Sequence, residues 1–241
     1  MNPLPFLILE TGRPLPALRR LGPFTHWIRV AAGLGARDTA VCAVMDDAQL
    51  PNPRRYAGVL VTGSGAMVTE RLPWSERSAD WLRDADARGL PLFGICYGHQ
   101  LLAHAFGGEV GYNPRGREMG TVAVQLKPEA AADPLFAGLG PSLRAHATHL
   151  QTVLAPPPGA TLLAHSEQDD CQAFRLRDSV WGVQFHPEFS ARMMRGYIHA
   201  RREDLSREGR CHSELSGAVK PAPRAREVLR RFVRFARHAH S

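Results

Sequence analysis

A cysteine, Cys96, lies at the centre of the sequence GICYG, between Gly94 and Gly98. An apolar run precedes it and a helical pattern follows it, so we expect Cys96 at a sharp strand-to-helix turn with the spacing of the G-x-S-x-G nucleophile elbow. Glycines on both sides leave room for such a turn. The positive end of the following helix, which begins near Tyr97, favours the thiolate, the nucleophilic form of cysteine. A free cysteine can also be a small buried hydrophobic residue, and this pattern alone leaves both interpretations open.

His186 and Glu188 lie near the end of another apolar run, in the sequence GVQFHPEF. Residues two apart in extended backbone face the same side, so the Glu188 carboxylate is placed to orient the His186 imidazole and to stabilise its protonated form. A histidine at a strand end is often only structural. Together with the Cys96 turn, however, the pair predicts nucleophilic catalysis, in which His186 takes the thiol proton and later delivers it to a leaving amine.

A glycine-rich turn, Gly63-Ser64-Gly65, follows the apolar run VLV. Such a turn can expose backbone N–H groups to an anion. We expect an N–H group of Gly63 or Ser64, together with that of Tyr97, to hold the oxyanion that forms when sulfur attacks a carbonyl. A phosphate loop is the weaker interpretation, because the pattern G-x-x-x-x-G-K-[ST] is absent and no lysine is near. A plain tight turn is the remaining alternative.

Short apolar runs that alternate with helical patterns must position these residues. Strands are predicted at 5–10, 39–45, 56–62 and 90–95, and helices at 24–35, 74–89 and 99–108. The two strands at 39–45 and 56–62 are rich in valine and are expected to be buried. This order favours an α/β fold with a mostly parallel central sheet flanked by helices. Open sheets of this kind bind ligands at the carboxyl edge of their strands, where Cys96 is expected.

The pattern changes after residue 120. Strand candidates follow closely at 121–126, 142–149, 160–166, 171–177 and 179–186. They are expected to extend the sheet or to form an additional antiparallel layer. We expect a single domain over residues 1–241, with residues 206–223 as a mobile loop within it.

The composition, 44% hydrophobic and 22% charged over 241 residues, is that of an ordinary soluble protein. The first apolar run is too short to span a membrane and lacks the pattern of a secretory signal, so we expect a cytoplasmic chain with reduced thiols. Much of the formal charge of +7 lies near the C-terminus. There the apolar residues of RAREVLRRFVRFA lie near one helical face, which predicts a helix docked on the core. We therefore expect neither a membrane nor a nucleic acid as partner.

These residues together resemble the class I glutamine amidotransferase family. The resemblance runs from about residue 38 to 190 and rests on the sequences PLFGICYGHQLLAHAFGG, TGSGAMV and QFHPEF. REMGTVAVQL and THLQTV look like the stand-alone branch related to the amidotransferase domain of GMP synthase, with matches at Glu118, Gly120 and His149. Two positions depart from the family pattern: Gln151 replaces an acid, and Ser64 separates two glycines that are often adjacent.

The resemblance implies a flavodoxin-like sheet and a Cys-His-Glu triad. Cys96 would be the nucleophile, His186 the general base and acid, Glu188 the orienting residue, and Gln100 a residue that binds glutamine. The implied reaction releases ammonia from glutamine through a γ-glutamyl thioester and needs no metal or organic cofactor. The histidines are too dispersed to suggest a zinc cluster, and His149 has no evident acidic partner in the sequence.

No synthetase segment and no P-loop is recognisable in the chain. Either a separate synthetase subunit would receive the ammonia, or the enzyme acts alone. A solitary enzyme would be able to hydrolyse γ-glutamyl peptides or conjugates, which is a second hypothesis. A third is a non-catalytic interaction subunit; the complete set of Cys96, His186 and Glu188 argues against it.

Overall fold

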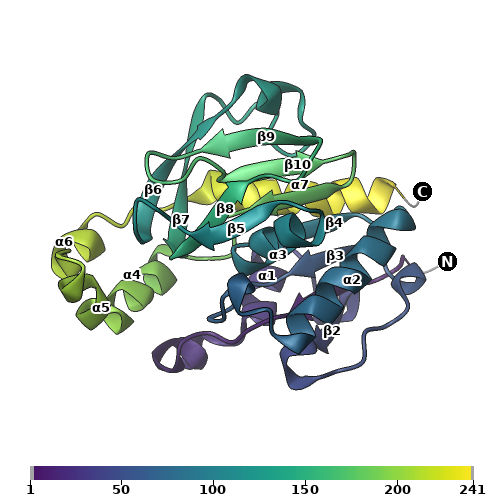
Figure 1. The fold of residues 1–241 in the computed structure, drawn as a ribbon, viewed down its shortest axis with the longest axis horizontal. Coiled ribbons are helices and arrows are strands. Elements are labelled where there is room, and N and C mark those ends of the chain that lie inside the picture. The colour runs from purple at the N-terminus through teal and green to yellow at the C-terminus, as the bar shows by residue number, and fades with distance from the viewer. Residues whose placement is uncertain (1–2, 240–241) are drawn as a thin grey trace.

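Nine strands form one sheet in the computed structural model, which describes residues 3–239 (Figure 1). The strand order is β2-β1-β3-β4-β11-β10-β9-β6-β7. Parallel pairing joins β2 (Thr39–Ala43), β1 (Phe6–Glu10), β3 (Gly58–Val61), β4 (Leu92–Ile95) and β11 (Val180–Val183). The mostly parallel central sheet predicted from the sequence is therefore confirmed.

Four antiparallel strands extend this sheet beyond β11. They are β10 (Ala173–Leu176), β9 (Ala160–His165), β6 (Glu118–Leu126) and β7 (Ser142–His149). Both outcomes expected for this region occur, because a separate antiparallel pair also forms.

That separate pair consists of β5 (Glu109–Tyr112) and β8 (Gln151–Ala155), neither of which was among the predicted strands. β5 has no buried residue and β8 ends in exposed residues, so neither has the continuous apolar run of a core strand.

Helices cover both faces of the parallel strands. α2 (Pro73–Ala87) and α3 (Tyr97–Ala105) pack on one face, and α1 (Phe24–Ala32) and α7 (Pro223–His238) on the other. Side chains alternate along β1: Phe6 and Ile8 join the core under α1 and α7, while Leu7 and Leu9 join the core under α2 and α3. The predicted C-terminal helix is confirmed as α7.

A helical arm, α4 (Ala191–Ala200), α5 (Arg202–Arg207) and α6 (His212–Gly217), lies at the left of Figure 1 and was not predicted. Its apolar residues pack with those of α1 and β6, including Trp27 and Met119. Residues 206–223 contain the end of α5, all of α6 and the start of α7, so much of the expected loop is helical; its mobility stays a prediction. Short 3-10 turns lie at 16–21, 36–38, 44–46, 53–55, 68–70 and 128–132.

One predicted strand differs in its surroundings. β2 was expected to be buried, but it is the edge strand of the sheet, and Val41 is 43% exposed. A valine-rich run therefore forms an edge strand here as readily as a central one. Within residues 3–239, every helix is too short or too polar to cross a membrane.

Candidate active site

Cys96 follows directly on β4 and precedes α3. Its φ of 52° and ψ of −101° put it in a conformation that residues with a side chain rarely adopt. The Cys96 N–H donates to the carbonyl of Val183 at 2.8 Å, which ties the turn to β11. The turn also needs its glycines: a Cβ atom on Gly94 would lie 2.3 Å from the carbonyl oxygen of Gly98, and one on Gly98 would lie 2.6 Å from that of Val61. The sharp strand-to-helix turn expected from GICYG is thus present.

His186 and Glu188 follow β11, the strand beside β4. The His186 N–H donates to the carbonyl of His146 at 2.8 Å, and the imidazole stacks on Phe189 with the ring centres 4.1 Å apart. Nδ1–H of His186 donates to Oε1 of Glu188 at 2.8 Å. Both side chains are buried, so this bond is shielded from water.

Cys96 and His186 meet across Gly63. A Cβ atom on Gly63 would lie 3.2 Å from Cε1 of His186 and 3.9 Å from Cβ of Cys96. Burial favours the neutral thiol, but the charge of His186 and a hydrogen bond to it outweigh burial and lower the pKa of Cys96. Burial favours neutral imidazole too, yet the charges of Glu188 and Cys96 raise the pKa of His186. The arrangement therefore favours a thiolate beside an imidazolium.

Backbone N–H groups lie on both sides of this pair. Tyr97 turns its phenol toward α2, where Oη lies 2.7 Å from Oγ of Ser75, and burial raises the pKa of Tyr97 to about 12. Its N–H, at the first position of α3, has no acceptor within residues 3–239, and neither have those of Gly63 and Ser64. Ser64 occupies the turn without a left-handed φ. The predicted oxyanion donors are free, and their role stays a prediction.

Gln100, on the first turns of α3, is held by its own amide. Nε2 donates to the carbonyl of Gln151 at 2.7 Å and to Oε1 of Gln184 at 2.8 Å. Its Oε1 accepts from none of residues 3–239, and the side chain lines a pocket beside Cys96. This geometry leaves a fixed carbonyl oxygen for a substrate N–H group.

The pocket is formed by segments that lie far apart in the sequence. They contribute these residues: Ser64, Gly65, Ala66, Met67, Cys96, Tyr97, Gln100, Arg117, Thr148, His149, Leu150, Gln151 and Arg201. Arg117 and Arg201 were not foreseen as site residues. Arg117 precedes the matched Glu118, which was a usable signal, whereas Arg201 lies in the unpredicted helical arm.

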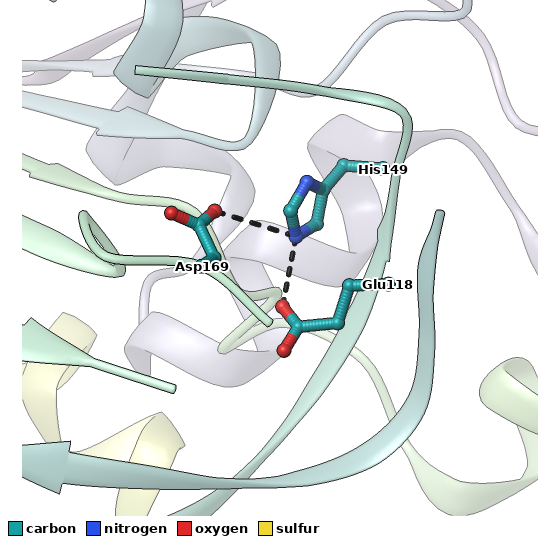
Figure 2. Close-up of side chains that lie close together, drawn as sticks. All are labelled: Glu118, His149 and Asp169. Atoms are coloured by element: carbon teal, nitrogen blue, oxygen red, sulfur yellow. Dashed lines mark hydrogen bonds and ion pairs between the residues drawn. The ribbon is translucent and has the colours of Figure 1, made fainter. Parts of the chain in front are cut away.

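His149 lies between two buried carboxylates, as Figure 2 shows. Nε2–H donates to Oε2 of Glu118 at 2.9 Å, Oδ2 of Asp169 is 3.6 Å from Nε2, and Nδ1–H donates to the carbonyl of Gln151 at 2.9 Å. Burial alone would lower the pKa of His149, but Glu118 and Asp169 raise it, so the ring is an imidazolium. The expectation that His149 lacks an acidic partner was wrong, because the fold brings Glu118 and Asp169 to it from distant parts of the chain.

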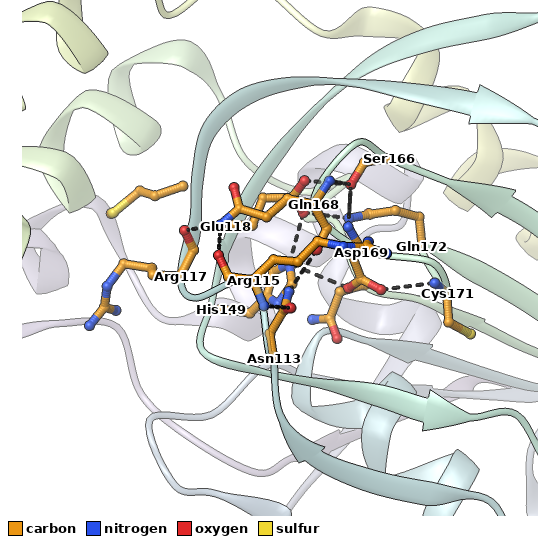
Figure 3. A network of polar contacts seen from close by, with 12 residues as sticks. Asn113, Arg115, Arg117, Glu118, His149, Ser166, Gln168, Asp169, Cys171 and Gln172 are labelled. Carbon is orange, nitrogen blue, oxygen red and sulfur yellow. Dashed lines mark hydrogen bonds and ion pairs between the residues drawn. The ribbon is translucent and has the colours of Figure 1, made fainter. Parts of the chain in front are cut away.

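The same network continues outward from Glu118 (Figure 3). Oγ of Ser166 donates to Oε1 of Glu118 at 2.5 Å, and Nε2 of Gln172 donates to Oε2. Donor atoms of Glu118, His149 and Asp169 lie within 4.8 Å of one another, a spacing that also suits a metal ion. Since both ring N–H groups of His149 already have acceptors, we interpret the cluster as a buried ion-pair network.

The family model described as glutamine amidotransferase class-I matches residues 25–202. The chain belongs to this family. One component of the glutamine-hydrolyzing GMP synthase of Ignicoccus hospitalis is 46% identical over 99 residues, which are 41% of this chain and 50% of that protein. Matches to the first such relatives span half of their length or less.

Two further relatives cover more of this amidotransferase chain. Gamma-glutamyl peptidase 4 of Arabidopsis thaliana is 28% identical over 149 residues, 60% of this chain and 59% of that protein. The crystal structure of a glutamine amidotransferase from Methylobacillus flagellatus is 26% identical, with a TM-score of 0.74 over 96% of this chain and 94% of that one. The fold is therefore that of the class I amidotransferases, as the resemblance implied.

Proposed function

We propose that this class I amidotransferase chain hydrolyses the γ-amide of glutamine with a Cys96–His186–Glu188 triad. The observation that carries the proposal is the buried contact of Cys96 and His186 across Gly63, with Glu188 bonded to the far side of the imidazole. A cysteine whose pKa is lowered beside an imidazolium is an activated nucleophile.

The proposed reaction proceeds in two steps. The Cys96 thiolate attacks the γ-carbonyl carbon, and the N–H groups of Tyr97 and of Gly63 or Ser64 hold the oxyanion. His186 gives its proton to the leaving nitrogen, ammonia departs, and a γ-glutamyl thioester remains on sulfur. Water then gives its proton to His186 and attacks the thioester, so that glutamate leaves and the thiolate returns.

Release of ammonia and glutamate from glutamine is the test of this proposal. Wild-type protein should release both in equal amounts, and Cys96→Ala should abolish the release together with labelling by a glutamine-mimicking electrophile. Labelling that persists in Cys96→Ala would identify another nucleophile and refute the triad. If ammonia is released only when a synthetase subunit is added, that subunit is the acceptor, as the name of the GMP synthase relatives suggests.

A second candidate function, hydrolysis of γ-glutamyl peptides, is favoured by the similarity to gamma-glutamyl peptidase 4. The same triad would act, with an amine in place of ammonia as the leaving group. Comparing turnover of glutamine with that of γ-glutamyl dipeptides separates the two functions, because a peptidase leaves glutamine unused. The cytoplasmic location and the synthetase partner stay predictions.

A further inference from the structure

Two arginines enter the pocket beside Cys96 with unused hydrogen-bond donors. Arg117 is 8% exposed, and its Nε donates to both carboxylate oxygens of Glu208, at 3.0 and 3.1 Å. Its Nη atoms have no acceptor within residues 3–239. Arg201, at the end of α4, has a buried Nε without a partner and a single 3.4 Å contact from Nη1 to Asp204.

The charge of the pocket is one-sided. Arg117, Arg201 and the His149 imidazolium line it, and none of the described lining residues is acidic. A buried guanidinium with a free edge is costly unless an acceptor completes its hydrogen bonds. The planar fork of arginine fits a carboxylate, to which it can donate two parallel hydrogen bonds.

We propose that Arg117 and Arg201 form a carboxylate-binding subsite beside Cys96, so that the substrates are γ-glutamyl compounds held by a carboxylate against the two guanidinium groups. This inference rests on the proposed function and adds the substrate class. The carboxylate has two sources, the α-carboxylate of the γ-glutamyl group and a carboxylate on the leaving amine.

Four substrates separate these sources. Glutamine and γ-glutamylmethylamide have only the α-carboxylate, γ-glutamylglycine has both carboxylates, and the α-amide of glutamine has neither. The variants are Arg117→Gln and Arg201→Gln. Matched controls are Arg115→Gln and Arg202→Gln, since those neighbouring side chains are exposed outside the pocket and pair with Asp170 and Glu203.

We expect each pocket variant to lose about tenfold or more in kcat/KM, mainly through a higher KM, on substrates that have the bound carboxylate. The control variants should behave like wild type. A loss on glutamine, methylamide and dipeptide alike assigns the α-carboxylate, and a loss on γ-glutamylglycine alone assigns the leaving group. An equal loss on all four substrates, or no loss at all, overturns the subsite.

Arg117→Gln also removes the ion pair with Glu208, so Glu208→Gln is the structural control. If Arg117 binds substrate, Glu208→Gln keeps the substrate preference; if Arg117 only anchors α5, Glu208→Gln reproduces the Arg117→Gln profile and the inference fails. Wild-type protein that turns over none of the four substrates would overturn the proposed function and this inference with it. Active wild type with unselective variants would overturn this inference alone.

Discussion

Nδ1 of His186 lies 2.8 Å from Oε1 of Glu188, in a place that solvent does not reach. Because Nδ1–H is committed to the carboxylate, Nε2 is the nitrogen that can exchange a proton with Cys96. The Glu188 charge also raises the pKa of His186, so the ring stays protonated at neutral pH and can act as the acid toward the leaving amine. Orientation and charge of the imidazole thus depend on one carboxylate.

Replacing that carboxylate should impair turnover without removing the nucleophile. We expect Glu188→Gln to lower kcat by about 10²-fold or more, since general acid catalysis is lost. Activity that needs protonated His186 falls as pH rises through its pKa. Because Glu188 raises that pKa, the alkaline limb of the kcat profile should move to lower pH in the variant. Glu203→Gln, an exposed position on α5, is the control; an unchanged alkaline limb in Glu188→Gln would contradict the assigned role.

The buried network around His149 should act on Cys96 through charge. Glu118 raises the pKa of His149, and the His149 charge contributes to lowering the pKa of Cys96. In Glu118→Gln the His149 pKa falls, the positive charge is lost at neutral pH, and the Cys96 pKa rises. Alkylation of Cys96 by iodoacetamide, followed against pH, should show a midpoint at higher pH than in wild type. The exposed Glu167→Gln should leave the midpoint in place, and a network that is only structural would leave it in place in Glu118→Gln as well.

Much of the fold follows from local pattern. The runs at 5–10, 56–62 and 90–95 are apolar because both faces of the central strands are covered by helices. The missed pair β5 and β8 shows the limit, since these strands are held by each other at the surface and lack an apolar run. Helix α4 was missed for a similar reason: only Met194, Tyr197 and Ile198 of its ten residues are buried.

The candidate site divides in the same way. Cys96, His186 and Glu188 stand in short motifs, so their types and spacing single them out, although their roles stay predictions. Asp169 and Arg201 stand in no motif, and only the tertiary fold brings them to the His149 ion pair and to the pocket. Charge pairing between distant segments leaves no periodic signal along a chain.

Phe232 of α7 should be a main source of stability. It is fully buried and its ring contacts those of Phe6, Phe93 and Trp181, which lie on three strands. Phe232→Ala removes these contacts and leaves a cavity, so we expect the free energy of unfolding to fall by about 4 kcal/mol. Urea denaturation measures this change. Val30→Ala, at a 55% exposed position of α1, should change stability by less than about 0.5 kcal/mol, and a similar small effect of Phe232→Ala would show that α7 is not part of the core.

Gly98 should be required for the geometry of the turn as well as for stability. A methyl group there would lie 2.6 Å from the carbonyl oxygen and 2.8 Å from the Cβ of Val61, both in the rigid strand β3, so α3 must shift away from the sheet. We expect Gly98→Ala to cost about 2 kcal/mol in unfolding free energy, and to slow alkylation of Cys96 because the thiol moves away from His186. Gly217→Ala in α6 is the control, since no atom lies within 4 Å of the added carbon. Gly98→Ala protein with wild-type stability and an unchanged alkylation rate would show that the turn does not need a glycine at this position.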